Sequence, residues 1–214
     1  MIPALLVSIL LPSLCAFALV TSPSKSSSPQ FAGCISPQTF KAISQADTFG
    51  LLSKQEDNSA CMELCGNKRF SYSYYHPRSA QCHCTKTESI DPSGIESGCD
   101  HLGGCDPCQA FVTYLHSPLS FTSCYSLLFG KPFLEFEAET LENCLSICST
   151  DIYDTEVVGV QSKYTLDVKG KEKGEGRWGW KCSCYSGRNQ GASKERYKVG
   201  CGKESVWRFK VPRE

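Results

Sequence analysis

Apolar and polar residues follow different patterns along this chain, and each pattern predicts a different element. Residues 2–20, IPALLVSILLPSLCAFALV, are uncharged and almost wholly apolar, and the run closes with Ala16-Phe17-Ala18. Such a run with a small-x-small end predicts a secretory signal peptide over residues 1–18, removed from the mature protein. A membrane anchor is the alternative, because the run is just long enough to span a bilayer. Pro12 and the cleavage-like end favour removal.

Two later stretches have helical character, and two have the character of strands. SACMELC (59–65) and ETLENCLSIC (139–148) predict helices, with polar N-cap candidates Asp57, Asn58 or Ser59 before the first and Thr140 in the second. RFSYSYYH (69–76) and EVVGVQSKY (156–164) are rich in aromatic and β-branched residues and predict strands. Cys-x-Cys follows each strand. Cysteines at i and i+4 lie on one face of a helix, and cysteines at i and i+2 lie on one face of a strand. Two disulfides should therefore join each helix to its sheet.

These segments belong to a repeat. FAGCIS at 31–36 matches FTSCYS at 121–126, and both halves continue with cysteines in the order C…CxxxC…CxC…C. We infer a duplicated unit with a period of about 90 residues. The domains are 31–116, with eight cysteines, and 121–214, with six, and the short join HSPLS (116–120) predicts that they pack end to end. Residues 19–30 are Ser- and Pro-rich and predict a disordered lead-in.

Composition supports a small disulfide-rich fold for each unit. The chain has 15 cysteines in 214 residues, and removal of the leader would remove Cys15 and leave an even number in an oxidising route. Many pairings are possible, and we predict a nested one. The predicted bridges are Cys34–Cys108, Cys61–Cys84, Cys65–Cys82, Cys99–Cys105, Cys124–Cys201, Cys144–Cys184 and Cys148–Cys182.

The candidate chemistry does not favour an enzyme. Formal net charge is zero, which gives no reason to expect a nucleic-acid partner. Cys105-Asp-Pro-Cys108 reads as two structural half-cystines rather than a redox dithiol, since no thioredoxin-like pattern surrounds it. His83 and His101 lie near cysteines, but in an oxidising route disulfides are favoured over zinc, so we expect no metal and no cofactor.

The acidic residues likewise lack a catalytic signature. Glu135, Glu137 and Glu139 alternate beside Phe133 and Phe136, which predicts a half-exposed strand. A glycosidase needs two carboxylates across a cleft, which spacing alone does not establish. The loop VKGKEKGEGR, with Lys169, Lys171, Lys173 and Arg177, predicts a solvated hairpin tip.

The order of these pieces resembles the WSC domain, a module of fungal wall-stress sensors and secreted fungal proteins. The matching residues in the first copy are FAGCIS, Cys61, Cys65, Cys82, Cys84, Cys99, Cys105 and Cys108; in the second they are FTSCYS, Cys144, Cys148, Gly159-Val160-Gln161, Cys182, Cys184 and Cys201-Gly202. The resemblance covers nearly all of residues 31–211. It implies an α+β fold in which a small antiparallel sheet cradles one helix, and a non-enzymatic role in binding polysaccharide.

Departures from the family pattern mark a divergent member or a relative in the PAN/apple group. CHCT and CSCY stand where the family has CxCG, the first copy has SYSYY in place of Gly-Val-Gln, and the second lacks one disulfide and carries an insert over 163–181. The resemblance implies a secreted protein, in the medium or the cell wall, with glucan, chitin or mannan as partner. An extracellular protein partner and a structural wall role are the alternatives.

Aromatic side chains are the best ligand candidates, because sugar rings stack on tyrosine and tryptophan. The strand of the first copy offers Tyr72, Tyr74 and Tyr75, and Trp178, Trp180 and Tyr185 flank the second Cys-x-Cys. The competing interpretation is that alternating strand aromatics fill the core. Trp178 and Trp180 share one face of their strand, which is either inner or exposed.

Overall fold

The computed structural model describes residues 28–87, 90–150, 154–166, 176–187, 191 and 194–212. The predicted signal peptide, residues 19–27 of the lead-in and the lysines of the charged loop lie outside the described residues. The lead-in prediction is wrong for its last three residues. Ser28 to Gln30 already belong to the first strand, where Ser28 pairs with Ser117 and Gln30 pairs with Tyr114.

The first half of the chain forms a five-stranded antiparallel sheet in the order β1-β5-β3-β4-β2. Its strands are β1 (Ser28–Ile35), β2 (Leu51–Lys54), β3 (Tyr72–His76), β4 (Gln81–Thr85) and β5 (Ala110–Ser117). The strand predicted over residues 69–76 is β3, and it begins at Tyr72, three residues later than expected. Leu51–Lys54 forms a further strand at the edge of this sheet, opposite Gln81–Cys84.

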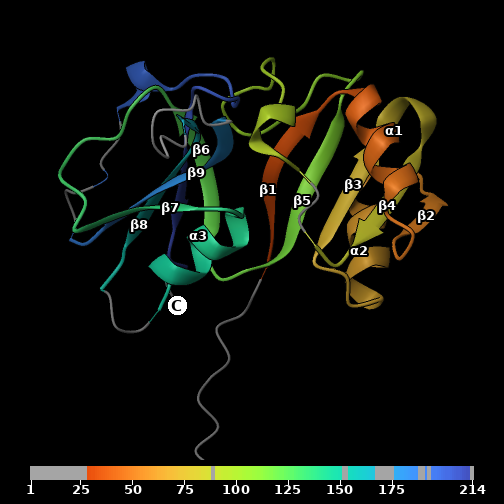
Figure 1. Ribbon diagram of the computed structural model, residues 1–214, viewed down its shortest axis with the longest axis horizontal. Helices are drawn as coiled ribbons and strands as arrows, with labels where there is room; N and C mark the ends of the chain where they lie inside the picture. Colours follow the sequence, from red (N-terminus) through yellow and green to blue (C-terminus); the bar gives the residue numbers. More distant parts are fainter. Residues whose placement is uncertain are drawn as a thin grey trace, which may run out of the picture.

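The second half repeats this arrangement. Its antiparallel sheet has the order β6-β10-β8-β9-β7, which is the first order with every number raised by five. The strands are β6 (Ser120–Tyr125), β7 (Leu134–Ala138), β8 (Val157–Leu166), β9 (Gly176–Tyr185) and β10 (Val206–Lys210). A disulfide-rich α+β fold with antiparallel sheets is confirmed, and the two sheets are consistent with two sheet domains (Figure 1).

In the described part of the chain, three helices accompany the sheets: α1 (Pro37–Ala46), α2 (Asn58–Asn67) and α3 (Leu141–Cys148). Side-chain caps fix their starts, since Asp57 Oδ1 accepts from Ala60 N and Thr140 Oγ1 accepts from Asn143 N. The expectation of one helix per sheet is wrong for the first half, where α1 is an additional helix. Short 3₁₀ turns occur at Pro77–Ser79, Pro92–Gly94 and Glu195–Tyr197.

The disulfides confirm one predicted bridge and correct the others. Cys124–Cys201 is present as predicted. The remaining bridges are Cys34–Cys105, Cys61–Cys82, Cys65–Cys84, Cys144–Cys182 and Cys148–Cys184. The nested pairing predicted for the two disulfides that join each helix to a strand is therefore wrong. The predicted bridges Cys34–Cys108 and Cys99–Cys105 are also wrong. Among the cysteines that the structure describes, Cys99 and Cys108 have no disulfide partner.

The relative direction of helix and strand explains why the disulfides between them are not nested. α2 is followed by β3, and β4 returns antiparallel to β3, so that β4 runs in the same sense as α2. The first cysteine of the helix then meets the first cysteine of the strand, and the second meets the second. α3, β8 and β9 repeat this path with the same outcome.

One buried apolar cluster extends across both sheets. It includes Tyr74 and Val112 of the first sheet, Val160 and Trp207 of the second, and Leu145 of α3. Aromatic rings join the two halves, since the centroid of Phe31 lies 5.1 Å from that of Phe121 and 5.4 Å from that of Trp207. A smaller cluster lies between α2 and the opposite face of the first sheet. Within the described ranges, no helix has the length and apolarity needed to cross a membrane.

Candidate functional site

The outer edge of the second sheet carries a row of ion pairs. β7 presents glutamates at alternate positions, which confirms the half-exposed strand predicted from the sequence. Each glutamate meets a cation from β8 or β9. The pairs are Glu135–Lys181 at 2.8 Å, Glu137–Lys163 at 2.6 Å and Glu139–Arg177 at 3.3 Å. This face of the sheet is therefore charged and exposed to solvent.

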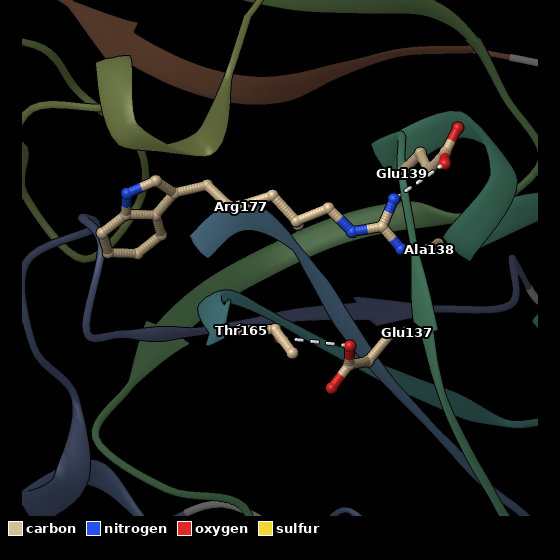
Figure 2. A pocket seen from close by; sticks show the side chains of 7 residues that line it. Glu137, Ala138, Glu139, Thr165 and Arg177 are labelled. Atoms are coloured by element: carbon tan, nitrogen blue, oxygen red, sulfur yellow. Dashed lines mark hydrogen bonds and ion pairs between the residues drawn. The ribbon is translucent and has the colours of Figure 1, made fainter. Parts of the chain in front are cut away.

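A hollow of about 250 Å³ opens at the end of this row. Its lining comes from the ends of β7, β8 and β9 and consists of Glu137, Ala138, Glu139, Thr165, Arg177, Trp178 and Gly179. Figure 2 shows Arg177 reaching toward Glu139, whereas Glu137 is directed toward Thr165, whose hydroxyl donates to Oε2 at 3.2 Å. The hollow is thus lined by carboxylate acceptors and by hydroxyl and guanidinium donors, and hydrogen bonds between these groups hold them in place.

An aromatic pair lies at the same end of these strands, on the opposite face of the sheet from the ion pairs. Trp178 on β9 lies directly opposite Tyr164 on β8, and their ring centroids are 5.4 Å apart. Tyr164 is 49% exposed and Trp178 is half-buried. Lys203 Nζ lies 5.8 Å from the centroid of the Trp178 ring, which is within the range of a cation–π contact. The rings therefore form a partly solvent-accessible apolar surface with the Lys203 ammonium beside it.

This site occupies a part of the second sheet that the first sheet lacks. β3 and β4 pair over five residues each, whereas β8 and β9 pair over ten. In the common part, Cys82 lies opposite Tyr75, as Cys182 lies opposite Val160. The pair Tyr164 and Trp178 lies beyond it, in the extension. The candidate site is thus a feature added to the repeated unit.

The electrostatics of the hollow suit binding better than acid catalysis. A hydrogen bond from Lys163 holds the pKa of Glu137 below its ordinary value of 4.5, with further contributions from Thr165 and from the charge of Arg177. Glu137 is therefore an ionised hydrogen-bond acceptor at neutral pH, not a proton donor. Carboxylate acceptors, a guanidinium donor and an accessible indole are groups that recognise a polyhydroxylated ligand.

Of the six aromatic residues predicted to bind ligand, the structure places one at this site. Trp178 lines the hollow. The others lie inside the protein, with exposed fractions of 6% or less: Tyr72, Tyr74, Tyr75, Trp180 and Tyr185. These five therefore have no accessible ring face to offer a sugar, and the core interpretation holds for them. Burial also raises the pKa of Tyr185 above its ordinary value.

Both faces of the first sheet are covered, which explains why every position of β3 is buried, its three tyrosines included. Tyr75 packs against the two disulfides that join α2 to β4, and its hydroxyl donates to Glu56 O at 2.8 Å. Tyr72 and Tyr74 belong to the large cluster on the other side. Tyr164, Thr165 and Lys203 were not predicted as site residues. Tyr164 was already part of the predicted strand, and its pairing with Trp178 depends on the register of β8 and β9.

A second hollow lies beside α1 and is lined by Ala42, Ile43, Ala46, Asp47 and Thr87. Behind Asp47 lies His83, which is 1% exposed, with 3.4 Å between its Nε2 and Asp47 Oδ2. Burial lowers the pKa of His83 below its ordinary value of 6.5, although the charge and hydrogen bond of Asp47 oppose this shift. The polar groups in its lining are Asp47, which is paired with the buried His83, and Thr87, so we treat this hollow as structural.

His83 should make the fold less stable at mildly acidic pH. The pKa of His83 is lower in the folded protein than in the unfolded chain. As the pH falls below about 6.5, the unfolded chain therefore takes up a proton that the folded protein does not, and the free energy of unfolding decreases. We expect the free energy of unfolding, measured with urea, to decrease from pH 7.5 to pH 5.5. His83→Gln should reduce this decrease. An equal decrease in the parent protein and the variant would contradict the assignment.

Comparison with protein-family models, with curated protein sequences and with solved structures found no significant match. The likeness to the WSC domain therefore stays a prediction that rests on the residues quoted for it.

Proposed function

We propose that this protein is a secreted, non-enzymatic carbohydrate-binding protein built from two tandem WSC-like domains. Six disulfides fit an oxidising compartment such as the extracellular space. The identical strand order of the two sheets supports a duplicated unit. The ligand class that fits best is a polysaccharide of the cell wall or extracellular matrix, with glucan, chitin and mannan as candidates.

One observation carries this proposal: a partly exposed aromatic pair and a hollow lined by fixed polar groups lie at the same end of the β8–β9 hairpin, on its two faces. A sugar ring has apolar C–H faces and a rim of hydroxyls, and it needs both kinds of surface. Trp178 and Tyr164 supply the first. Glu137, Glu139 and Arg177 supply the second, since each retains an exposed edge while it is held by its ion pair. The geometry favours binding in the second domain.

Sedimentation with insoluble β-glucan, chitin and mannan tests the proposal. We expect the protein to sediment with one polymer and to be released by soluble oligomers of that polymer. Trp178→Ala and Tyr164→Ala should each weaken binding about tenfold, which corresponds to the loss of about 1.4 kcal/mol of stacking. Phe49→Ala is the matched control, because Phe49 is an aromatic residue 92% exposed on the first half and should not affect binding.

Two outcomes would overturn the proposal. If none of the polymers retains the protein, a protein partner of the PAN/apple kind becomes the better interpretation. If a polymer retains the protein and the two aromatic variants bind as tightly as Phe49→Ala, the polysaccharide site lies elsewhere on the molecule. Circular dichroism of each variant separates a lost site from a lost fold.

A further inference from the structure

Three sulfur atoms gather at the base of one loop in the first half. Cys34 on β1 and Cys105 form a disulfide, and the Sγ atoms of Cys34, Cys99 and Cys105 all lie within 4.8 Å of one another. Cys99 has no disulfide partner and is 5% exposed. A buried thiol therefore lies within reach of both sulfurs of an existing bridge.

The loop between Cys99 and Cys105 is held closed by its own backbone. Asp100 N donates to Gly104 O at 2.9 Å, and the Asp100 carboxylate accepts from Leu102 N and Gly104 N, both at 2.8 Å. Gly103 has φ +85°, a conformation that favours glycine. These bonds keep Cys99 and Cys105 close together whichever bridge is present.

The same loop binds the second sheet. His101 O accepts from Cys124 N at 2.8 Å and from Ser123 Oγ at 2.7 Å. Asp100 O accepts from Cys201 N at 3.2 Å, and a side chain at Gly200 would collide with the Cys99 carbonyl oxygen. The loop thus contacts the second sheet around the Cys124–Cys201 bridge, while Cys105 ties it covalently to β1 of the first sheet.

We propose that Cys34, Cys99 and Cys105 form a disulfide-exchange site that alternates between a bridge to β1 and a bridge within the loop. The Cys99 thiolate attacks Cys105 Sγ, a Cys99–Cys105 bond forms, and the Cys34–Cys105 bond breaks. The electron pair of the broken bond stays on Cys34 Sγ, which takes up a proton in place of the one that Cys99 lost to solvent. No oxidant or reductant is consumed. The exchange frees the loop from β1 without opening it.

Burial controls the rate of this exchange. The buried position raises the pKa of the Cys99 thiol to about 12, and the charges of Asp100 and Glu96 add to the effect. Only the thiolate attacks a disulfide, so exchange is slow at neutral pH. As long as the pH is below that pKa, each rise of one pH unit increases the thiolate fraction and the exchange rate about tenfold. A local opening that exposes Cys99 to water would accelerate it in the same way.

Disulfide mapping of the purified full-length mature protein tests the proposal. The protein is incubated at pH 7 and at pH 9, acid-quenched, alkylated under denaturing conditions and digested before Asp residues. This digestion cuts before Asp100 and Asp106 and so separates Cys99, Cys105 and Cys108. We expect alkylated Cys34 and a Cys99–Cys105 bridge to accumulate, with an initial rate at pH 9 about a hundredfold that at pH 7.

Two variants assign the attacking thiol. Cys99→Ser removes it and should leave Cys34–Cys105 unchanged at both pH values. Cys108→Ser is the matched control, because Cys108 is the other unpaired cysteine and its loss should not affect the exchange. Failure of exchange in Cys108→Ser, or a Cys34–Cys105 bridge that persists in the parent protein at pH 9, would overturn the proposal.

Purified protein with no free thiol also gives a decisive answer. A bridge from Cys99 to Cys34 or Cys105 in such protein would overturn the proposal, because no thiol remains to attack a bridge and the pairing is fixed. A Cys99–Cys108 bridge beside an intact Cys34–Cys105 bridge would overturn it.

Discussion

Replacing Trp207 by alanine should lower the free energy of unfolding by about 3–5 kcal/mol, the usual cost of removing a large buried aromatic side chain. Trp207 is 1% exposed and lies on β10, the strand next to β6. Its ring packs against Trp180 at 5.3 Å and against Phe31 at 5.4 Å between centroids. Nε1 donates to Ser205 Oγ at 3.1 Å. The substitution therefore leaves a cavity at the contact between the two halves.

Urea denaturation followed by fluorescence and by circular dichroism measures this effect. Because one apolar cluster includes residues of both sheets, we expect a single transition that both probes report together. Trp178→Ala is the matched control, since that tryptophan is half-buried at the surface and should cost about 1 kcal/mol or less. A loss below about 1.5 kcal/mol for Trp207→Ala, or two separate transitions in the parent protein, would show that the halves do not share a core.

The cysteine pattern alone predicted a large part of the fold. The spacing Cys61/Cys65 and Cys82/Cys84 placed a helix against a strand, and both elements are present, with Asp57 as the N-cap from among the three candidates. The spacing does not contain the relative direction of helix and strand, because two thiols on one face meet two others equally well in either sense. Direction comes from the intervening strand, and the nested pairing failed for that reason.

The extra helix α1 was missed although local signals for it exist. Ser36 Oγ accepts from Thr39 N at 3.0 Å, Pro37 occupies the first helical position, and Phe40 is the buried residue of the inner face. No cysteine marks this segment, so the repeat did not point to it. Its ring contact between Phe40 and His76 shows that α1 packs against the first sheet at β3.

Burial of the aromatic residues depends on contacts that are remote in sequence. Trp178 and Trp180 share one strand face, yet Trp180 is 1% exposed and Trp178 is half-buried. Trp180 contacts Trp207 from β10, whereas Trp178 lies farther along the β8–β9 hairpin and contacts Tyr164 and Lys203. The sequence placed both tryptophans on one strand face, and only the tertiary contacts separate Trp180 in the core from Trp178 at the surface.

Removal of one whole staple should be costly, and it distinguishes the two possible pairings. Cys144→Ala with Cys182→Ala removes a bridge of sequence separation 38, and loop-closure arguments predict a loss of about 2–4 kcal/mol in the free energy of unfolding. The neighbouring Cys148–Cys184 bridge remains intact in this variant. The number of free thiols, counted after denaturation without reductant, should therefore equal that of the parent protein.

The matched control is Cys144→Ala with Cys184→Ala, which removes one cysteine from each observed bridge. This variant should lose both staples, expose two additional thiols at Cys148 and Cys182, and unfold at a lower urea concentration than the first variant. A nested pairing would reverse the two results, because Cys144 and Cys184 would then be partners. The comparison is internally balanced, since each variant carries two cysteine-to-alanine changes and one of them, at Cys144, is shared. The direction in which α3 runs along β9 thus becomes measurable as a count of thiols.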